Sequence, residues 1–197
     1  MDIQDQDQDQ AAGVGGMPSK PGRRRFASAG AKASGVILTL ASTPGMACVC
    51  KTPSGSLSGN LQTSSHSTQT VVCNGMSPGY WKNWPDQWPS GCYPTTTAYQ
   101  TATKFATIFP NGATTLYQTG TLMDVLISND PAQDPHNLGA HLVAAYLNVK
   151  SNKISFFTVA VLKTIWHDLY TYGYYAPAAG VKWFAKDVAN YLSSTEN

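Results

Sequence analysis

Residues 138–149 read Leu-Gly-Ala-His-Leu-Val-Ala-Ala-Tyr-Leu-Asn-Val, a segment that would be apolar nearly all round if it were a helix. Leu138 and Leu142 lie on one helical stripe, and further apolar residues cover its flanks. Asp134 and Pro135 come just before it and predict an N-cap with proline at the first helical position. Because a short helix that is apolar on most sides must be surrounded by other elements, we predict that this is the central helix of the domain.

Four further segments have helical patterns with recognisable start or stop signals. They are 97–109, stopped by Pro110-Asn111-Gly112; 121–127, with Thr121 and Asp124 at capping-box spacing; 155–173, with Ser155 as cap and Gly173 as C-terminal glycine; and 181–192. No segment shows sustained two-residue alternation, although the β-branched Thr70-Val71-Val72 leaves room for short strands in 51–75. The predicted fold is mainly α: a compact bundle of about four to five helices, preceded by an irregular, aromatic, disulfide-linked segment.

The front of the chain has the parts of an export signal. Arginines at 23–25 are followed by a short apolar run, a helix-breaking Pro44 and small residues up to Ala47. The run is too short to span a bilayer. We therefore predict four parts: 1–16, a disordered acidic extension or a stretch before the true start; 17–47, an export signal cleaved between Ala47 and Cys48; 48–72, a Ser/Thr/Gly-rich linker; and 73–197, the aromatic segment plus the helical domain.

A lipid anchor on Cys48 is the competing interpretation of the cleavage site. Gly45-Met46-Ala47-Cys48 resembles a lipobox, but Gly45 stands where a branched aliphatic residue is usual. Unless Cys48 is lipidated, we expect no membrane contact after processing. The predicted location is secreted, periplasmic or extracellular at the cell surface.

Four cysteines follow the predicted signal, and an even number in an exported chain favours disulfides. Three pairings of Cys48, Cys50, Cys73 and Cys92 are open. Cys73 with Cys92 would close a loop around the aromatic segment, and the alternatives tie Cys48 and Cys50 to the other two. A zinc site would need a second cysteine pair or clustered histidines at ligand spacing, and the sequence has neither. We therefore expect no metal and no cofactor.

Charge excludes some partners. The chain has 13 basic and 11 acidic residues. Eight of the basic and seven of the acidic residues follow residue 47, so this part has a net charge of +1. So balanced a charge offers no electrostatic footprint for nucleic acid. A polar surface built from Thr, Ser, Asn, Gln and Tyr suits a glycan or a surface protein as partner, and also suits a plain extracellular protein.

Residues 77–89 form an unusual aromatic segment, in which Pro78-Gly79 marks a turn and three tryptophans follow within eight residues. One interpretation places Tyr80 and Trp81 in the helical core. The other leaves Trp84 and Trp88 exposed as a platform for sugar rings or a partner protein, since exposed aromatic patches mark interaction sites. The candidate binding residues are these four.

This segment resembles the opening of a module found in many exported bacterial proteins of undetermined function. Such modules begin with a Pro-Gly-Tyr-Trp-Lys-Asn string, followed by an apolar Leu-Leu-Asp element and a helix that ends in Leu-Asn. The matching residues are 78–83, 122–126 and 138–148, and the resemblance covers 73–192. It implies an extracellular or surface setting and no particular chemistry. Trp84 stands where a histidine often follows the asparagine, so no histidine-dependent site is implied there.

The sequence favours a non-enzymatic role. His141 lies in the predicted central helix, where we expect a core histidine bonded to a backbone carbonyl. His167 and Asp168 are sequence neighbours, which on a helix do not face each other. Candidate acids are present but spacing cannot show that they converge; they are Asp86, Asp124, Asp130, Asp134 and Asp168.

The predicted function is a secreted or cell-surface structural or binding module, with adhesion to a glycan or protein through exposed aromatics. The alternatives are a cell-envelope hydrolase and a subunit of an extracellular assembly. The oligomeric state is left open.

Overall fold

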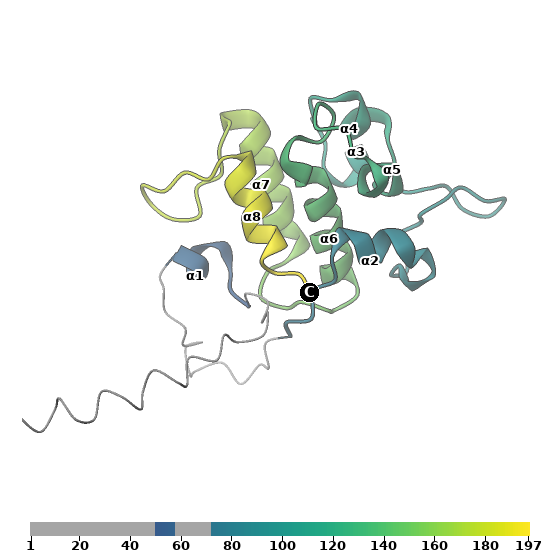
Figure 1. The fold of residues 1–197 in the computed structure, drawn as a ribbon, viewed down its shortest axis with the longest axis horizontal. Coiled ribbons are helices and arrows are strands. Elements are labelled where there is room, and N and C mark those ends of the chain that lie inside the picture. Colours follow the sequence, from purple (N-terminus) through teal and green to yellow (C-terminus); the bar gives the residue numbers. More distant parts are fainter. Residues whose placement is uncertain (1–49, 58–71) are drawn as a thin grey trace, which may run out of the picture. The chain divides into compact units, whose positions relative to one another are not determined.

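The computed structural model describes residues 50–57 and 72–197, which belong to one compact unit, Met46–Asn197, and are mainly helical (Figure 1). The predicted extension, export signal and cleavage site lie outside the described residues, as do residues 58–71 of the linker. The helices and 3-10 turns are α1 (Pro53–Leu57), α2 (Pro78–Asn83), η2 (Pro85–Gln87), α3 (Phe105–Ile108), α4 (Thr115–Thr119), α5 (Leu122–Ile127), η3 (Pro135–Asn137), α6 (Leu138–Lys150), α7 (Val159–Tyr172) and α8 (Ala185–Ser193). The prediction of a mainly α fold is confirmed.

Pairing between extended segments is limited, within the described ranges, to isolated β-bridges. They are Cys73 with Ile154, Gly75 with Glu196, Lys104 with Thr121, and Tyr175 with Trp183. No helix in the same ranges is both long and apolar enough to cross a bilayer.

Helix α6 is the central helix, as its composition predicts. It contacts α2, α5, α7 and α8, and the residues from Leu138 to Asn148 are buried except for His141. Gly139 allows the close approach of α4 and α5, because a Cβ atom there would lie 2.6 Å from Tyr117 Cε1 and 2.9 Å from Val125 Cγ1. The apolar stripe and the small residues together explain why other helices surround α6.

The start of α6 differs from the prediction. Pro135 begins a separate 3-10 turn, η3, and the next two residues, His136 and Asn137, have left-handed backbones with φ of 62° and 56°. These two residues break the helix, so Asp134 does not cap it from the adjacent position. Its carboxylate instead reaches forward and accepts hydrogen bonds from the backbone N–H groups of Gly139 (2.7 Å) and Ala140 (3.0 Å). Asp134 therefore satisfies the first turn of α6 from outside the helix.

Two helix signals are confirmed. Thr121 and Asp124 form the predicted capping box of α5: the Asp124 backbone N–H donates to Thr121 Oγ1, and the Thr121 N–H donates to the Asp124 carboxylate. Gly173 ends α7 in a left-handed conformation with φ of 78°, and its N–H donates to the Leu169 carbonyl. Both signals are local, since each depends only on residues within about one turn.

Other boundaries differ from the prediction. Only Phe105–Ile108 is helical within 97–109, because the preceding residues form a hydrogen-bonded loop. Thr158 caps α7 in place of Ser155, whose hydroxyl accepts the Val72 N–H and so joins the segment around residue 72. The predicted linker contains α1, which starts with Pro53 behind the Thr52 hydroxyl.

A cluster of aromatic rings fills the core between α7 and the short helices α3 and α4. Phe105 and Tyr117 each lie 5.0 Å from Trp166, measured between ring centroids, and Phe109 lies 5.9 Å from it. The Trp166 indole N–H donates to the Pro110 carbonyl at 2.6 Å. Because the rings are fully buried and the indole N–H is satisfied, this cluster anchors α3 and α4 to α7, which lies much later in the sequence.

The disulfide joins Cys50 to Cys73, one of the pairings that the sequence left open. Cys48 lies outside the described residues. The disulfide predicted for Cys92 is not formed: its thiol is buried in the core and lies 3.7 Å from the Tyr146 hydroxyl. The physical reason is that Cys73 lies in the extended segment that pairs with Ile154, whereas Cys92 points into the apolar core.

We expect the Cys92 thiol of the folded chain to react with a thiol reagent at least a hundredfold more slowly than after unfolding. Burial raises the pKa of this thiol, which lowers the fraction of reactive thiolate, and it also blocks access to the sulfur. Peptide mapping under non-reducing conditions, with and without alkylation in denaturant, would measure both reactivity and pairing. A peptide that links Cys73 to Cys92 would contradict the pairing described here.

Candidate functional site

The predicted aromatic residues lie in and just after α2, which starts in the way its sequence indicates. The Ser77 hydroxyl accepts the Tyr80 N–H at 3.3 Å, and Pro78 occupies the first helical position. Trp81 is fully buried, and Tyr80 packs edge-on against it with a centroid distance of 5.2 Å. Trp81 therefore lies in the core and presents no surface to a partner, whereas Tyr80 is only partly buried and packs against the core.

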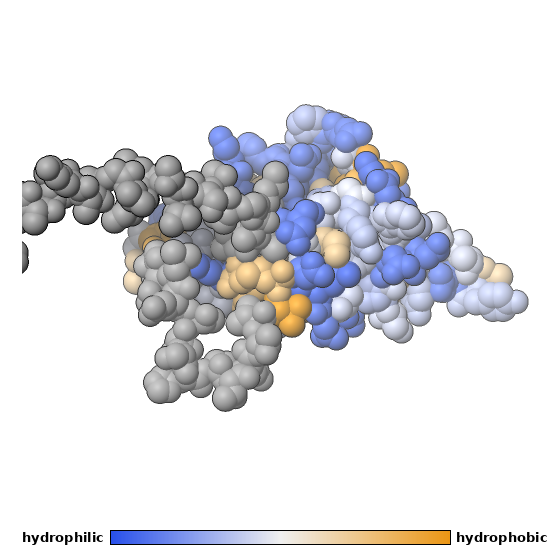
Figure 2. Space-filling view, turned by 60° about the horizontal axis from the view of Figure 1, so that its bottom comes forward, coloured by the Kyte–Doolittle hydropathy of each residue, from blue (hydrophilic) through white to orange (hydrophobic). Residues whose placement is uncertain are grey.

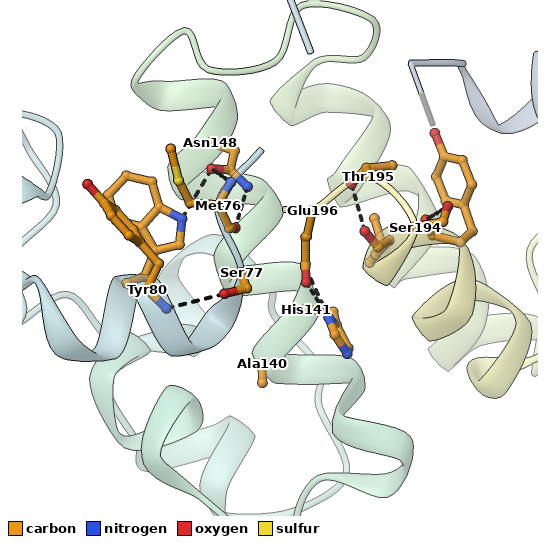
Figure 3. A network of polar contacts seen from close by, with 12 residues as sticks. Met76, Ser77, Tyr80, Ala140, His141, Asn148, Ser194, Thr195 and Glu196 are labelled. Atoms are coloured by element: carbon orange, nitrogen blue, oxygen red, sulfur yellow. Dashed lines mark hydrogen bonds and ion pairs between the residues drawn. The ribbon is translucent and has the colours of Figure 1, made fainter. Parts of the chain in front are cut away.

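Trp81 belongs to a polar network that centres on the Asn148 side chain (Figure 3). Asn148 Oδ1 accepts the Met76 backbone N–H at 2.8 Å and the Trp81 indole N–H at 3.2 Å. Its Nδ2 group donates to the Met76 carbonyl at 2.9 Å. The Asn148 side chain thus pairs with the Met76 backbone as a neighbouring strand would, and it also fixes the indole of Trp81. The role of these residues is structural.

Of the two tryptophans predicted to form a platform, one is exposed. The Trp88 indole N–H donates to the Trp81 carbonyl at 3.0 Å, and its ring packs partly against the core. Trp84 separates α2 from η2, and 59% of its surface is exposed. Trp84 alone of the four candidate residues therefore offers a large free aromatic face.

Among the residues that the structure describes, Tyr99 is the most exposed aromatic side chain. It was not predicted as a site residue, because the pattern of 97–109 indicates a helix. Tyr99 is 97% exposed. It lies in the loop of residues 93–103, here called the Tyr99 loop, which projects from the helices between α2 and α3 (Figure 1). A run of threonines with a single aromatic residue could have marked it as a loop.

Several hydrogen bonds cross the Tyr99 loop. At its base, the Thr103 N–H donates to the Tyr93 carbonyl (2.9 Å) and the Tyr93 N–H donates to Thr103 Oγ1 (2.8 Å). Nearer the tip, the Ala102 N–H donates to Thr96 Oγ1 at 3.0 Å and the Thr97 N–H donates to the Gln100 carbonyl at 2.8 Å. The threonine side chains thus satisfy the loop backbone, and Tyr99 is presented on an ordered support.

A second exposed aromatic group surrounds the loop between α7 and α8. Tyr172 is 62% exposed and Phe184 is 57% exposed, and the Lys182 ammonium lies 4.1 Å from the centroid of the Tyr174 ring. On the face shown in Figure 2, hydrophilic residues cover much of the described surface and hydrophobic residues form small groups. Exposed aromatic rings are therefore distributed over several loops.

His141 bonds a carboxylate, whereas a backbone carbonyl was predicted as its partner. Its Nδ1 atom lies 3.0 and 3.1 Å from the two Glu196 carboxylate oxygens (Figure 3). Burial raises the pKa of the Glu196 carboxyl, and the hydrogen bond to His141 opposes the rise. Within the described ranges no hydroxyl or thiol hydrogen-bonds to this imidazole. Together with the Asn197 N–H, which donates to the Gly75 carbonyl, it holds the last residues against α6.

Two of the other candidate acids have structural roles. Asp124 forms the capping box of α5, and Asp134 accepts backbone N–H groups from the first turn of α6. His167 and Asp168 do interact, contrary to the prediction: their Nδ1 and Oδ1 atoms lie 3.3 Å apart at the surface of α7. The side chains turn toward each other although their Cβ atoms point in different directions. Among the residues that the structure describes, no three His, Cys, Asp or Glu side chains group as metal ligands would.

Comparisons with known proteins give no relative: no family model, no curated protein and no solved structure matches the chain. The resemblance to an exported module stays a prediction. The structure adds that two of the matching strings contact each other, through Trp81 in 78–83 and Asn148 at the end of 138–148.

Proposed function

We propose that the chain is a secreted or cell-surface binding module that contacts a glycan or a surface protein through Tyr99 and Trp84. The observation that carries the proposal is the exposure of Tyr99, 97% of whose surface is free, on a loop with an ordered backbone. Tyrosine and tryptophan combine an apolar face with a polar tip and have only two side-chain torsions, so they provide contact area at a low cost in entropy.

The hydrogen bonds within the loop support a binding role over a passive one. Ordering a flexible loop on binding costs free energy, and hydrogen bonds that already fix the backbone remove much of that cost. A solvent-exposed ring adds nothing to the stability of the fold. The threonine bonds at Thr96 and Thr103 therefore maintain a shape that benefits contact with another molecule.

The cysteines support a setting outside the cytosol. Cys50 and Cys73 form a disulfide, and such bonds persist mainly in oxidising compartments. The predicted export signal agrees with this setting.

We expect Tyr99→Ala and Trp84→Ala each to weaken binding about tenfold, because truncating a central aromatic residue of an interface typically costs more than 1 kcal/mol. The measurements are a glycan array with the full chain and, for a protein partner, photo-crosslinking from position 99 in the cells that produce it. Tyr172→Ala is the matched control, since it removes another exposed ring, one about as exposed as Trp84, from a different part of the surface. Binding that survives the Tyr99→Ala, Trp84→Ala double change, or that is lost equally in the control, contradicts the proposal.

A further inference from the structure

A cleft of about 280 Å³ lies where the end of α3 meets the middle of α7. Its lining combines polar and apolar side chains: Thr107, Ile108, Pro110, Asn111, Lys163, Trp166 and His167. The volume falls just below the range of roughly 300–1,000 Å³ that is usual for drug-sized ligands. It is therefore suited to a ligand of about one ring.

The polar side chains that line this cleft, Thr107, Asn111, Lys163 and His167, are exposed to solvent and therefore accessible to a ligand. Within the described ranges, the Lys163 ammonium forms no ion pair, and neither the Asn111 amide nor the Thr107 hydroxyl forms a hydrogen bond. No carboxylate lines the cleft. Among the residues that the structure describes, Lys163 thus has no carboxylate partner and lies in one cleft with an amide and a hydroxyl, an arrangement that favours an anionic, hydroxyl-rich ligand.

His167 adds a second polar contact at the rim. Asp168 Oδ1 contacts its Nδ1 atom at 3.3 Å, while its Nε2 atom has a long 3.4 Å contact with the Thr171 hydroxyl. A ligand hydroxyl could replace that long contact at the Nε2 atom. Lys163 and His167 are four residues apart on α7, so both side chains lie on the same helical face.

The apolar part of the lining suits one face of a sugar ring. Ile108 is partly exposed and Pro110 is exposed, while the Trp166 indole is buried and donates to the Pro110 carbonyl. This bond joins the Pro110 backbone to α7, so the two sides of the cleft are in direct contact. A cleft with a few polar groups among apolar ones is the usual form of a small-molecule site.

We propose that this cleft binds a uronic acid, a sugar ring that carries a carboxylate. Lys163 pairs with the carboxylate, and Asn111, Thr107 and His167 bond the ring hydroxyls. The inference goes beyond the proposed function, since the cleft contains neither Trp84 nor Tyr99 and can be occupied whether or not those residues bind anything.

The test is a titration of the ¹⁵N-labelled full chain with glucuronic acid, followed by amide chemical shifts. We expect saturable shifts at Asn111, Lys163 and His167 in the millimolar range, and at least tenfold weaker binding of glucose, which lacks the carboxylate, and of acetate, which lacks the ring. Lys163→Gln should weaken binding at least fivefold. Lys186→Gln, a change of an exposed lysine on α8, should leave it within twofold.

Asn111→Gly provides a second variant that keeps the backbone. Asn111 has a φ of 67°, which glycine adopts without strain, so this change removes the amide alone. We expect weaker binding of glucuronic acid with an otherwise unchanged spectrum. Equal binding of acetate, equal binding of glucose, an unaffected Lys163→Gln variant or shifts confined to other residues would each overturn the proposal. None of these outcomes depends on Tyr99.

Discussion

Replacing Asp134 by alanine should lower the free energy of unfolding by about 4 kcal/mol, because three buried donors lose their acceptor at once. The Asp134 carboxylate is 1% exposed and accepts hydrogen bonds from the backbone N–H groups of Gly139 and Ala140 and from the Tyr117 hydroxyl at 2.7 Å. No water can replace this acceptor without entering the core. Urea unfolding followed by circular dichroism at 222 nm measures the effect.

Two further variants separate the parts of this interaction. Asp134→Asn retains one acceptor oxygen and should cost less, about 2 kcal/mol. Tyr117→Phe removes only the hydroxyl donor; burial and the hydrogen bond to Asp134 raise the pKa of Tyr117, which keeps it protonated as that donor. In a double-mutant cycle, the effects on stability of the changes at Asp134 and at Tyr117 should not be additive, since both changes affect the same hydrogen bond. A loss below 1 kcal/mol for Asp134→Ala would show that the first turn of α6 does not depend on this carboxylate.

Replacing Asn148 by alanine should lower the free energy of unfolding by about 3 kcal/mol. The change removes the partner of the Met76 N–H, the Met76 carbonyl and the Trp81 indole N–H, and it leaves the buried donors without an acceptor. The indole N–H resonance of Trp81 should shift in the ¹⁵N spectrum, which reports the loss at the site itself. Denaturant unfolding gives the magnitude.

Asn190→Ala is the matched control, because it removes an asparagine amide from the exposed side of α8. Surface substitutions of this kind usually change stability by less than about 0.5 kcal/mol. If the Asn148 and Asn190 variants unfold at the same urea concentration, the network around Met76 contributes nothing to stability.

The parts of the fold that could be predicted depend on short-range patterns. The apolar composition of 138–149 placed α6 at the centre, and the Thr121–Asp124 spacing marked the start of α5. The predicted helix over 97–109 was wrong for most of its length. Threonine side chains bond to backbone groups across the Tyr99 loop, and these bonds compete with the backbone bonds of a helix. Whether they form depends on which residues face each other after folding.

The candidate site was predictable only in part for a related reason. The four candidate residues are all large aromatics, and their positions in the sequence do not show which rings meet the core. They are Tyr80, Trp81, Trp84 and Trp88. Trp81 is buried because its indole reaches Asn148, 67 residues away in sequence, and Trp84 is exposed because α2 ends before it. The lining of the cleft likewise comes from two segments, around Pro110 and Lys163, that no sequence motif connects.

What the sequence by itself determined is the helical class, the central position of α6 and the signals at Thr121 and Gly173, because capping and amphipathicity involve residues within a few positions of each other. The tertiary structure alone decided which cysteines pair, where the Asp134 carboxylate reaches, and which aromatic rings remain free. Those outcomes follow from contacts between distant segments, such as Cys50 with Cys73 and Met76 with Asn148. The burial of one side chain in a packed core depends on all the segments around it, and short-range sequence patterns do not contain that information.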